Sequence, residues 1–285
     1  MKYAVFTVGL PEYTPEQALE KLKYHGYDGV EWRVTKIDPE KAGDKPSYWG
    51  NNLCTVDEAR ALALAPEIKA LSNKFGLEIC GLGTYLRSSA DPCALENLML
   101  AAKAMGTAQI RVSPDVYDGS VHYRQLFDQA LKDYAVVEGL ARKHGIKAVI
   151  EMHMNTIVAS ASAAYRLVSN FDPACIGVIY DTGNMVYEGF EDYKAGLEIL
   201  GDYLAHVHIK NAIWKLDAEE DDVKRFKPDW APFKGGHADF KRFFKALKSV
   251  GYDGWISFED FSDEQSPDEK LKDNLEYIKD VVSKA

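Results

Sequence analysis

A short unit recurs along the chain: a stretch ending in basic residues, then a glycine, then a short apolar segment. It is clearest at 23–34 (KYHGYDGVEWRV), 141–152 (ARKHGIKAVIEM) and 248–259 (KSVGYDGWISFE). A glycine after the last helical residue readily adopts the left-handed conformation that ends a helix. Although the copies are too dissimilar to form a sequence repeat, the recurrence predicts alternating helices and buried strands.

Eight strands are expected, each apolar nearly throughout, as in a parallel sheet covered on both faces. They are expected at 3–8, 28–33, 77–82, 108–112, 147–152, 176–181, 204–210 and 254–259. The helices between them are expected at 15–25, 56–75, 92–105, 121–144, 160–170, 190–200, 238–249 and 267–284. Three of their starts carry N-terminal signals, namely Thr14-Pro15, a capping box from Thr55 to Glu58, and Asp91-Pro92.

Eight strand–helix units in 285 residues predict a single (β/α)8 barrel domain over 1–285. The alternative is a doubly wound open sheet, which normally has a glycine-rich phosphate loop after its first strand. The segment TVGLPEYTPEQ lacks that GxGxxG pattern. Two long connections, 34–55 and 211–237, would lie on the C-terminal rim, where barrel enzymes keep their active sites.

Composition and charge restrict the partners. The chain has 34 basic and 44 acidic residues, a net charge of −10, and no basic cluster that would indicate nucleic-acid binding or an anionic membrane surface. No apolar run is long enough to span a bilayer, and the N-terminus does not resemble a signal peptide, so a cytoplasmic protein is expected. The four cysteines form no CxxC pair, which argues against a disulfide framework or a cysteine-based zinc site.

Polar residues lie at the ends of the last four expected strands. They are Glu151 and His153 on the fifth, Asp181 and the following Asn184 on the sixth, His206, His208 and Lys210 on the seventh, and Glu259 on the eighth. Residues two apart share one face of a strand. In a closed barrel, Glu151, Asp181, His208 and Glu259 can therefore point into one mouth.

Three inward carboxylates cannot satisfy one another, but a divalent cation satisfies all three. Three oxygen ligands and one imidazole favour Mn²⁺, with Mg²⁺ or Co²⁺ as alternatives, over a closed structural Zn²⁺ site. Taken singly, each residue has a simpler explanation, because a glutamate at a strand end is usually solvated or ion-paired and a lone histidine usually belongs to the core. Their occurrence on consecutive strands favours a site.

These motifs resemble the xylose-isomerase-like barrel superfamily, which includes sugar phosphate isomerases and epimerases, inosose dehydratases and the AP-endonuclease-2-like nucleases. The resemblance rests on the glutamate of strand five, YDTGN, HVHIKN and GYDGWISFED, and extends back to GYDGVEWR. It implies a metal held by Glu151, Asp181, His208 and Glu259, with His208 rather than His206 as the ligand of the H-x-H motif. Asn184 and Trp214 stand where the ketose 3-epimerases of this group have a histidine and an arginine.

The resemblance implies a metal-dependent sugar isomerase or epimerase that acts through an enediolate, with Glu151 and Glu259 on opposite faces of the reacting carbon. The substrate would be a ketose, an aldose or a related polyol. Expected substrate contacts are His153, Asn184, Lys210, Glu31, Arg33 and Trp214, although Glu31 and Arg33 can equally form an internal ion pair. The alternative is a lyase that eliminates from an oxo-sugar at the same site. A nuclease and a non-catalytic sugar-binding barrel are further alternatives, and family membership implies a homo-oligomer.

Overall fold

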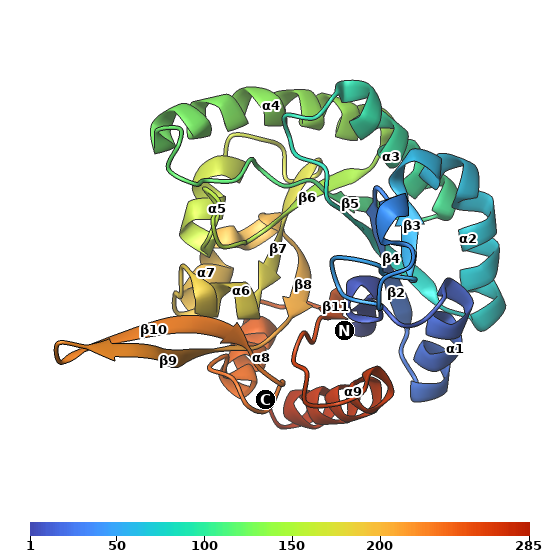
Figure 1. The fold of residues 1–285 in the computed structure, drawn as a ribbon. Coiled ribbons are helices and arrows are strands. Elements are labelled where there is room, and N and C mark those ends of the chain that lie inside the picture. The colour runs from blue at the N-terminus through green and yellow to red at the C-terminus, as the bar shows by residue number, and fades with distance from the viewer.

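Eight parallel strands close into a barrel in the computed structural model, which describes residues 1–285 (Figure 1). Around the barrel they are β1 (Lys2–Phe6), β2 (Gly29–Thr35), β4 (Glu78–Thr84), β5 (Gln109–Arg111), β6 (Lys147–Glu151), β7 (Ile176–Asp181), β8 (Leu204–Ile209) and β11 (Trp255–Phe258). The first strand pairs with both β2 and β11, which closes the ring. The predicted (β/α)8 fold is confirmed, and every expected strand is present within a few residues of its predicted bounds.

Helices surround the barrel and cover its outer face (Figure 1). They are α1 (Pro15–His25), α2 (Ala61–Phe75), α3 (Pro92–Met105), α4 (Tyr123–His144), α5 (Ala161–Val168), α7 (Tyr193–Leu200), α8 (Phe240–Ser249) and α9 (Pro267–Lys284). The main apolar core lies between these helices and the outward-facing residues of the strands. The inward face is thereby left to a different set of side chains, many of them polar.

The start of α1 was predicted correctly, whereas the start of α2 was not. Thr14 and Gln17 form the expected reciprocal capping box. Thr55 instead belongs to a short strand, β3 (Thr55–Asp57), which pairs with the edge of β2 and accepts a hydrogen bond from Arg33. A 3-10 helix capped by Asp57 follows, and α2 begins only at Ala61. Strand pairing therefore overrides the local capping signal.

Residues 211–237, predicted to be a long loop, contain a β-hairpin. The strands β9 (Ala212–Glu220) and β10 (Val223–Trp230) pair in antiparallel fashion, and the ribbon projects away from the barrel (Figure 1). Its turn is made by Asp221 and Asp222, both with positive φ, as a tight two-residue hairpin turn requires. The many charged residues of this segment hid the alternation of apolar and polar side chains along each strand.

No helix combines the length and the apolar character that crossing a lipid bilayer would demand. A short helix, α6 (Thr182–Tyr187), follows β7 directly and was not predicted. It lies at the mouth of the barrel, where it becomes part of the site described below.

Replacing Gly83 by alanine should destabilise the barrel from within. A Cβ at Gly83 on β4 would lie 2.3 Å from the ring of the buried Phe6, so the ring or the strand must shift. Overpacking of this kind costs about 1–3 kcal/mol of unfolding free energy, measurable by urea denaturation. The matched control is Gly139→Ala in the middle of α4, where an added Cβ meets nothing within 4 Å and should stabilise. Equal effects at the two positions would contradict the interior packing described here.

Candidate metal centre and pocket

Four ionisable side chains meet at the C-terminal mouth of the barrel. Glu151 ends β6, Asp181 ends β7, His208 lies in β8, and Glu259 directly follows β11. Their ligand atoms all lie within 4.8 Å of one another, and all four residues are buried. Parallel strands that end at one edge bring together residues that are far apart in the sequence. The structure thus assembles the four residues that the sequence motifs single out as a ligand set.

Asp181 presents only one of its carboxylate oxygens to this cluster. Its Oδ1 accepts hydrogen bonds from the backbone N–H groups of Gly183 at 2.9 Å and Asn184 at 2.8 Å, which caps the N-terminus of α6. Its Oδ2 lies 3.7 Å from Nδ1 of His208. The cap therefore fixes the carboxylate so that Oδ2 is the oxygen available for a cation.

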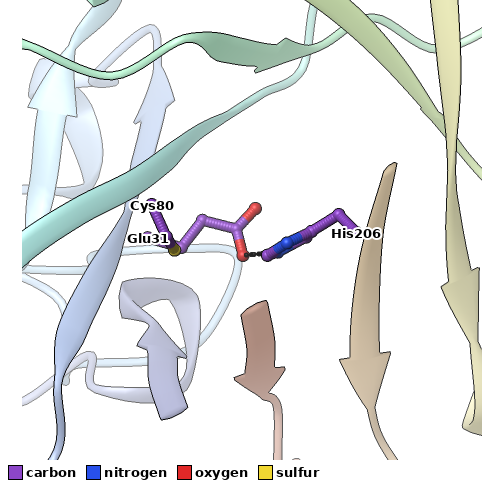
Figure 2. Close-up of side chains that lie close together, drawn as sticks. All are labelled: Glu31, Cys80 and His206. Carbon is purple, nitrogen blue, oxygen red and sulfur yellow. Dashed lines mark hydrogen bonds and ion pairs between the residues drawn. The ribbon is translucent and has the colours of Figure 1, made fainter. Parts of the chain in front are cut away.

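His208 is oriented by a carboxylate on the opposite side of its ring. Its Nδ1 faces the cluster, 3.4 Å from Glu151 Oε1 and 3.7 Å from Glu259 Oε1. Its Nε2 lies 3.0 Å from Glu31 Oε2, which also pairs with Nε2 of His206 at 3.1 Å (Figure 2). A carboxylate on the outer nitrogen of a ligand histidine sets its tautomer and strengthens it as a ligand. Glu31, one of the expected substrate contacts, lies behind His208 rather than in the pocket.

Lys210 places its ammonium group among the same carboxylates. Its Nζ lies 3.0 Å from Asp181 Oδ2, contacts Glu259 Oε2, and donates a hydrogen bond to Asn184 Oδ1 at 3.2 Å. Neither carboxylate contact has good hydrogen-bond geometry, so both oxygens remain without a directed donor although they are buried. Lys210 therefore neutralises negative charge here and contacts the same carboxylate oxygens that a bound cation would use.

Glu151 and Glu259 differ in how firmly they are held. Glu151 Oε2 pairs with Arg111, and its Oε1 accepts a hydrogen bond from Asn184 Nδ2 at 3.0 Å, so protein donors engage both oxygens. Glu259 Oε2 contacts the ammonium group of Lys210, but its Oε1 has no hydrogen-bond donor, and the nearest charged group to it is His208 Nδ1 at 3.7 Å. Glu151 is therefore held at both carboxylate oxygens, whereas Glu259 keeps one oxygen without a protein donor.

The charges around the two glutamates separate their proton affinities. Burial alone would raise the pKa of Glu151, but the charges of Arg111 and Lys210 hold that pKa well below its ordinary value. Burial raises the pKa of Glu259, and repulsion from Glu151 and Asp181 adds to the rise against the opposing charges of Lys210 and His208. Different surroundings push two neighbouring carboxylates towards different roles.

The carboxylates in turn stabilise the positively charged forms of Lys210 and His208. Burial lowers the pKa of Lys210, but the charges of Asp181, Glu259 and Glu151 outweigh it and raise the pKa above its ordinary value. The pKa of His208 is likewise raised, because the charges of Glu31 and Glu259 overcome the effect of burial. The three buried carboxylates at the mouth therefore create a negative electrostatic potential that stabilises any cation placed among them.

A pocket of about 290 Å³ opens above these residues. Glu151, Glu259, Lys210 and His153 supply polar groups at its floor and side. Nδ1 of His153 lies 2.8 Å from the carbonyl of Met154 and donates to it, which leaves Nε2 as the nitrogen able to exchange a proton with a ligand.

An aromatic wall faces this polar floor. It consists of Trp49, Trp230 and Phe261, with ring centroids 4.9 Å apart for Trp49–Phe261 and 5.4 Å apart for Trp230–Phe261. Aromatic faces beside hydrogen-bonding groups suit a ligand with both C–H and hydroxyl surfaces.

Besides Glu31, three more of the expected substrate contacts lie outside the pocket. Asn184 is fully buried behind Glu151 and Lys210. Arg33 lines a neighbouring hollow and donates to Thr55, so the alternative ion pair with Glu31 does not form. Trp214 stands at the base of the hairpin, where its Nε1 donates to the carbonyl of Val186 at 2.6 Å. His153 and Lys210 do line the pocket.

Sequence reasoning missed two parts of this site. Arg111 ends β5, engages Glu151 and lies over the rings of Phe6 and Tyr85. Phe261 was not considered, although it directly follows the GWISFED motif. An arginine at the end of an expected barrel strand next to a strand that ends in glutamate is the signal that would have identified the ion pair.

The residues present fit a divalent cation. Asp181 Oδ2 and Glu259 Oε2 are buried acceptors without a directed donor, and His208 turns Nδ1 towards them. Three carboxylate ligands and one imidazole form a donor set typical of catalytic Mn²⁺, Mg²⁺, Co²⁺ or Zn²⁺ sites with open positions. Glu151, Asp181, His208 and Glu259 would hold the ion.

The fold and this constellation agree with the comparisons to known proteins. Residues 19–281 match the family described as "Xylose isomerase-like TIM barrel". The chain belongs to that family.

Curated relatives bear the name inosose dehydratase. The protein of Lactiplantibacillus plantarum is 30% identical over 151 residues, which cover 47% of this chain and 46% of the relative. That of Clostridium botulinum is 28% identical over 193 residues, which cover 61% of each chain. The chain thus spans about half the length of the curated relatives it matches.

Solved structures share the fold over nearly the whole chain. The IOLI protein with a bound zinc atom superposes with a TM-score of 0.74 at 19% identity, covering 100% of this chain and 99% of the other. The 3-keto-D-glucoside 4-epimerase of E. coli gives 0.71 at 16% identity, covering 98% and 99%. At these identities the likeness concerns the fold alone.

Lys210→Met should tighten divalent-metal binding. The ammonium group competes for Asp181 Oδ2 and Glu259 Oε2, so its removal should lower the dissociation constant for Mn²⁺ roughly tenfold or more. Isothermal titration calorimetry on chelator-treated protein measures this constant. Lys215→Met, which removes an exposed ammonium paired with Asp229 on the hairpin, is the matched control and should leave it unchanged. Weaker binding in Lys210→Met would show that Lys210 supports the metal site instead of competing with it.

Proposed function

We propose that this chain is a divalent-metal-dependent enzyme that acts on a small keto-sugar or keto-polyol. Glu259 removes the proton next to the ketone, and a hydroxyl group on the following carbon then leaves as water. The reaction is a dehydration, so the enzyme would be a lyase. The observation that carries this proposal is the asymmetry of the two glutamates, because Glu151 is bound on both oxygens and Glu259 is not.

The asymmetry favours one base over two. Epimerisation through a two-base mechanism needs a proton acceptor on each face of the carbon. Arg111 and Asn184 occupy the oxygens of Glu151 and its pKa is lowered, which suits a ligand and not a base. Glu259 lines the pocket and burial raises its pKa, which makes it the stronger base of the two glutamates.

Each step of the proposed reaction can be assigned to a residue of the pocket. The C–H bond next to the ketone breaks, its proton moves to Glu259, and its electrons form the enediolate. A divalent cation held by the four ligands would polarise the ketone oxygen and stabilise that negative charge. The C–O bond of the next carbon then breaks as His153 donates a proton to the departing hydroxyl. Lys210 donates to a substrate oxygen beside Glu259.

The pocket indicates an uncharged substrate. Both arginines in its lining already have protein partners, since Arg111 pairs with Glu151 and Arg87 donates to the carbonyl of Pro114 at 2.8 Å. Arg111 is therefore not available to bind a phosphate group, and Arg87 alone would be a weak anchor for one. The wall of Trp49, Trp230 and Phe261 suits the C–H face of a ring. The inosose dehydratase name of the curated relatives supports a cyclic keto-polyol as the first compound to test.

Isomerisation or epimerisation is the second candidate, because it shares the deprotonation step and differs only in where the proton returns. Lys210 favours it, since its ammonium contacts Glu259 and can relay a proton to a substrate oxygen. In that case the cation, for which Mn²⁺ is the first choice, and its ligands would be the same. Dehydration and isomerisation or epimerisation are distinguished by their products, because only dehydration releases water.

The first test incubates the Mn²⁺-loaded protein with an inosose and, separately, with ketohexoses in D₂O. The proposal expects loss of water from the inosose, seen by mass spectrometry. Glu259→Gln should slow both deuterium exchange at the carbon next to the ketone and water loss, by about 10²–10⁴-fold at saturating metal. Label incorporated into an epimer or isomer without loss of water would support the second candidate and reject the dehydration.

A second test separates proton removal from expulsion of water. His153→Gln should leave deuterium exchange near the parent rate while slowing formation of the dehydrated product about 10²-fold. The matched control is His237→Gln, because His237 is exposed and lies outside the pocket lining. If exchange and elimination fall together in His153→Gln, the histidine acts in substrate binding and not as the acid.

A further inference from the structure

A second group of metal-binding side chains lies deeper in the barrel, beneath the first. Figure 2 shows Glu31 from β2, Cys80 from β4 and His206 from β8 turned towards one another in the barrel interior. They are 2%, 5% and 0% exposed, respectively. His206 precedes His208 by two residues on the same inward face of β8, so this cluster lies one layer further from the pocket.

We propose that Glu31, Cys80 and His206 form a second divalent-metal site, separate from the one at the mouth and suited to a zinc-type ion. The carboxylate of Glu31, Sγ of Cys80 and a ring nitrogen of His206 would be its protein ligands. A water molecule or a neighbouring side chain would complete the coordination. This inference does not depend on the proposed reaction.

The geometry is close to what such an ion needs. The ligand atoms of the three residues all lie within 4.8 Å of one another, and Glu31 Oε2 is 3.1 Å from His206 Nε2. Tetrahedral zinc with its usual bond lengths to nitrogen, oxygen and sulfur separates its ligands by about 3.3–3.8 Å. Side-chain rotations that move the ligand atoms by about an ångström would therefore complete the site without moving the strands.

The chemistry of the ligands distinguishes this site from the upper one. A thiolate and an imidazole favour Zn²⁺ and Co²⁺, whereas three carboxylates favour harder ions. One carboxylate and one thiolate carry two negative charges, so a divalent ion would make the cluster electrically neutral. Neutrality matters in a buried position, because an uncompensated charge there costs several kcal/mol.

The surroundings contain polar atoms that lack partners. His206 Nδ1 makes no hydrogen bond, and neither does Ser257 Oγ on the neighbouring strand β11, although both residues are fully buried. Ser257 is in register with His208, so its side chain faces the barrel interior one layer above His206, between the deeper cluster and the mouth. Buried polar groups without partners are rare and often mark the place of a water molecule or ion.

Glu31 would link the two sites. Its Oε1 lies 3.3 Å from Nε2 of His208, so this oxygen can keep that hydrogen bond while Oε2 binds the deeper ion. The deeper ion would then fix Glu31, and Glu31 fixes the ring of His208. Burial, reinforced by the charge of Glu31, raises the pKa of the Cys80 thiol well above its usual range, so binding would release a proton.

Cobalt titration of the chelator-treated full chain tests this site directly. Co²⁺ bound to a thiolate gives an intense near-ultraviolet charge-transfer band that carboxylate and imidazole ligands do not produce. We expect about two Co²⁺ per chain by native mass spectrometry, together with the thiolate band. Cys80→Ser should remove the band and one ion. Cys93→Ser, at an exposed cysteine far from the cluster, is the matched control and should change neither.

Glu259→Gln keeps the two sites distinguishable. It should weaken binding at the mouth while the thiolate band persists, whatever reaction the protein catalyses. Absence of the band in the parent protein would overturn the proposal and leave Glu31 as a hydrogen-bond acceptor for two imidazoles. A band that persists in Cys80→Ser would overturn it as well. If Cys80→Ser does not fold, judged by circular dichroism, the parent spectrum and Glu259→Gln still decide the question.

Discussion

Burial of negative charge inside the barrel is the constraint on which the rest of the site depends. Glu31, Glu151, Asp181 and Glu259 are all nearly inaccessible to water. Such carboxylates are tolerated only when cations and donors surround them, and Lys210, Arg111 and His208 supply part of that compensation. The compensation is uneven, and this unevenness gives Glu151 and Glu259 different proton affinities. The same electrostatic arrangement therefore accounts for both the stability of the centre and its chemical asymmetry.

The fold was predictable because its signals are local and repeated. Each helix-ending glycine and each short apolar strand constrains only its neighbours, yet eight such units leave the closed barrel as the simplest arrangement. Where a local signal failed, a non-local contact was responsible. Thr55 resembles a helix cap, but Arg33 and the edge of β2 draw it into β3. The hairpin of β9 and β10 was missed because its strands are rich in charged residues, which is typical of a solvated loop. In the structure some of these residues pair across the ribbon, such as Lys215 with Asp229.

The four residues that the structure brings together at the mouth were recognisable in the sequence, because each stands at the end of one expected strand, and their role as metal ligands stays a prediction. The roles of the residues around it were not visible, because they depend on which side of the ring or carboxylate a partner approaches. Glu31 was expected to face the substrate and instead supports His208 from behind. Asn184 was expected at the same place and instead holds Glu151. A sequence identifies the residues near a site more readily than it identifies the atom that each one presents.

The short helix α6 has a mechanical consequence. Asp181 caps its first turn, and the carbonyl of Val186 in its last turn accepts the indole N–H of Trp214 on β9. Asp181, one of the four proposed metal ligands, is thus connected through the six residues of α6 to the base of the projecting ribbon. The residue that presents Oδ2 to the cluster is thereby tied to the strand that begins the ribbon, in addition to the covalent connection of that strand to β8.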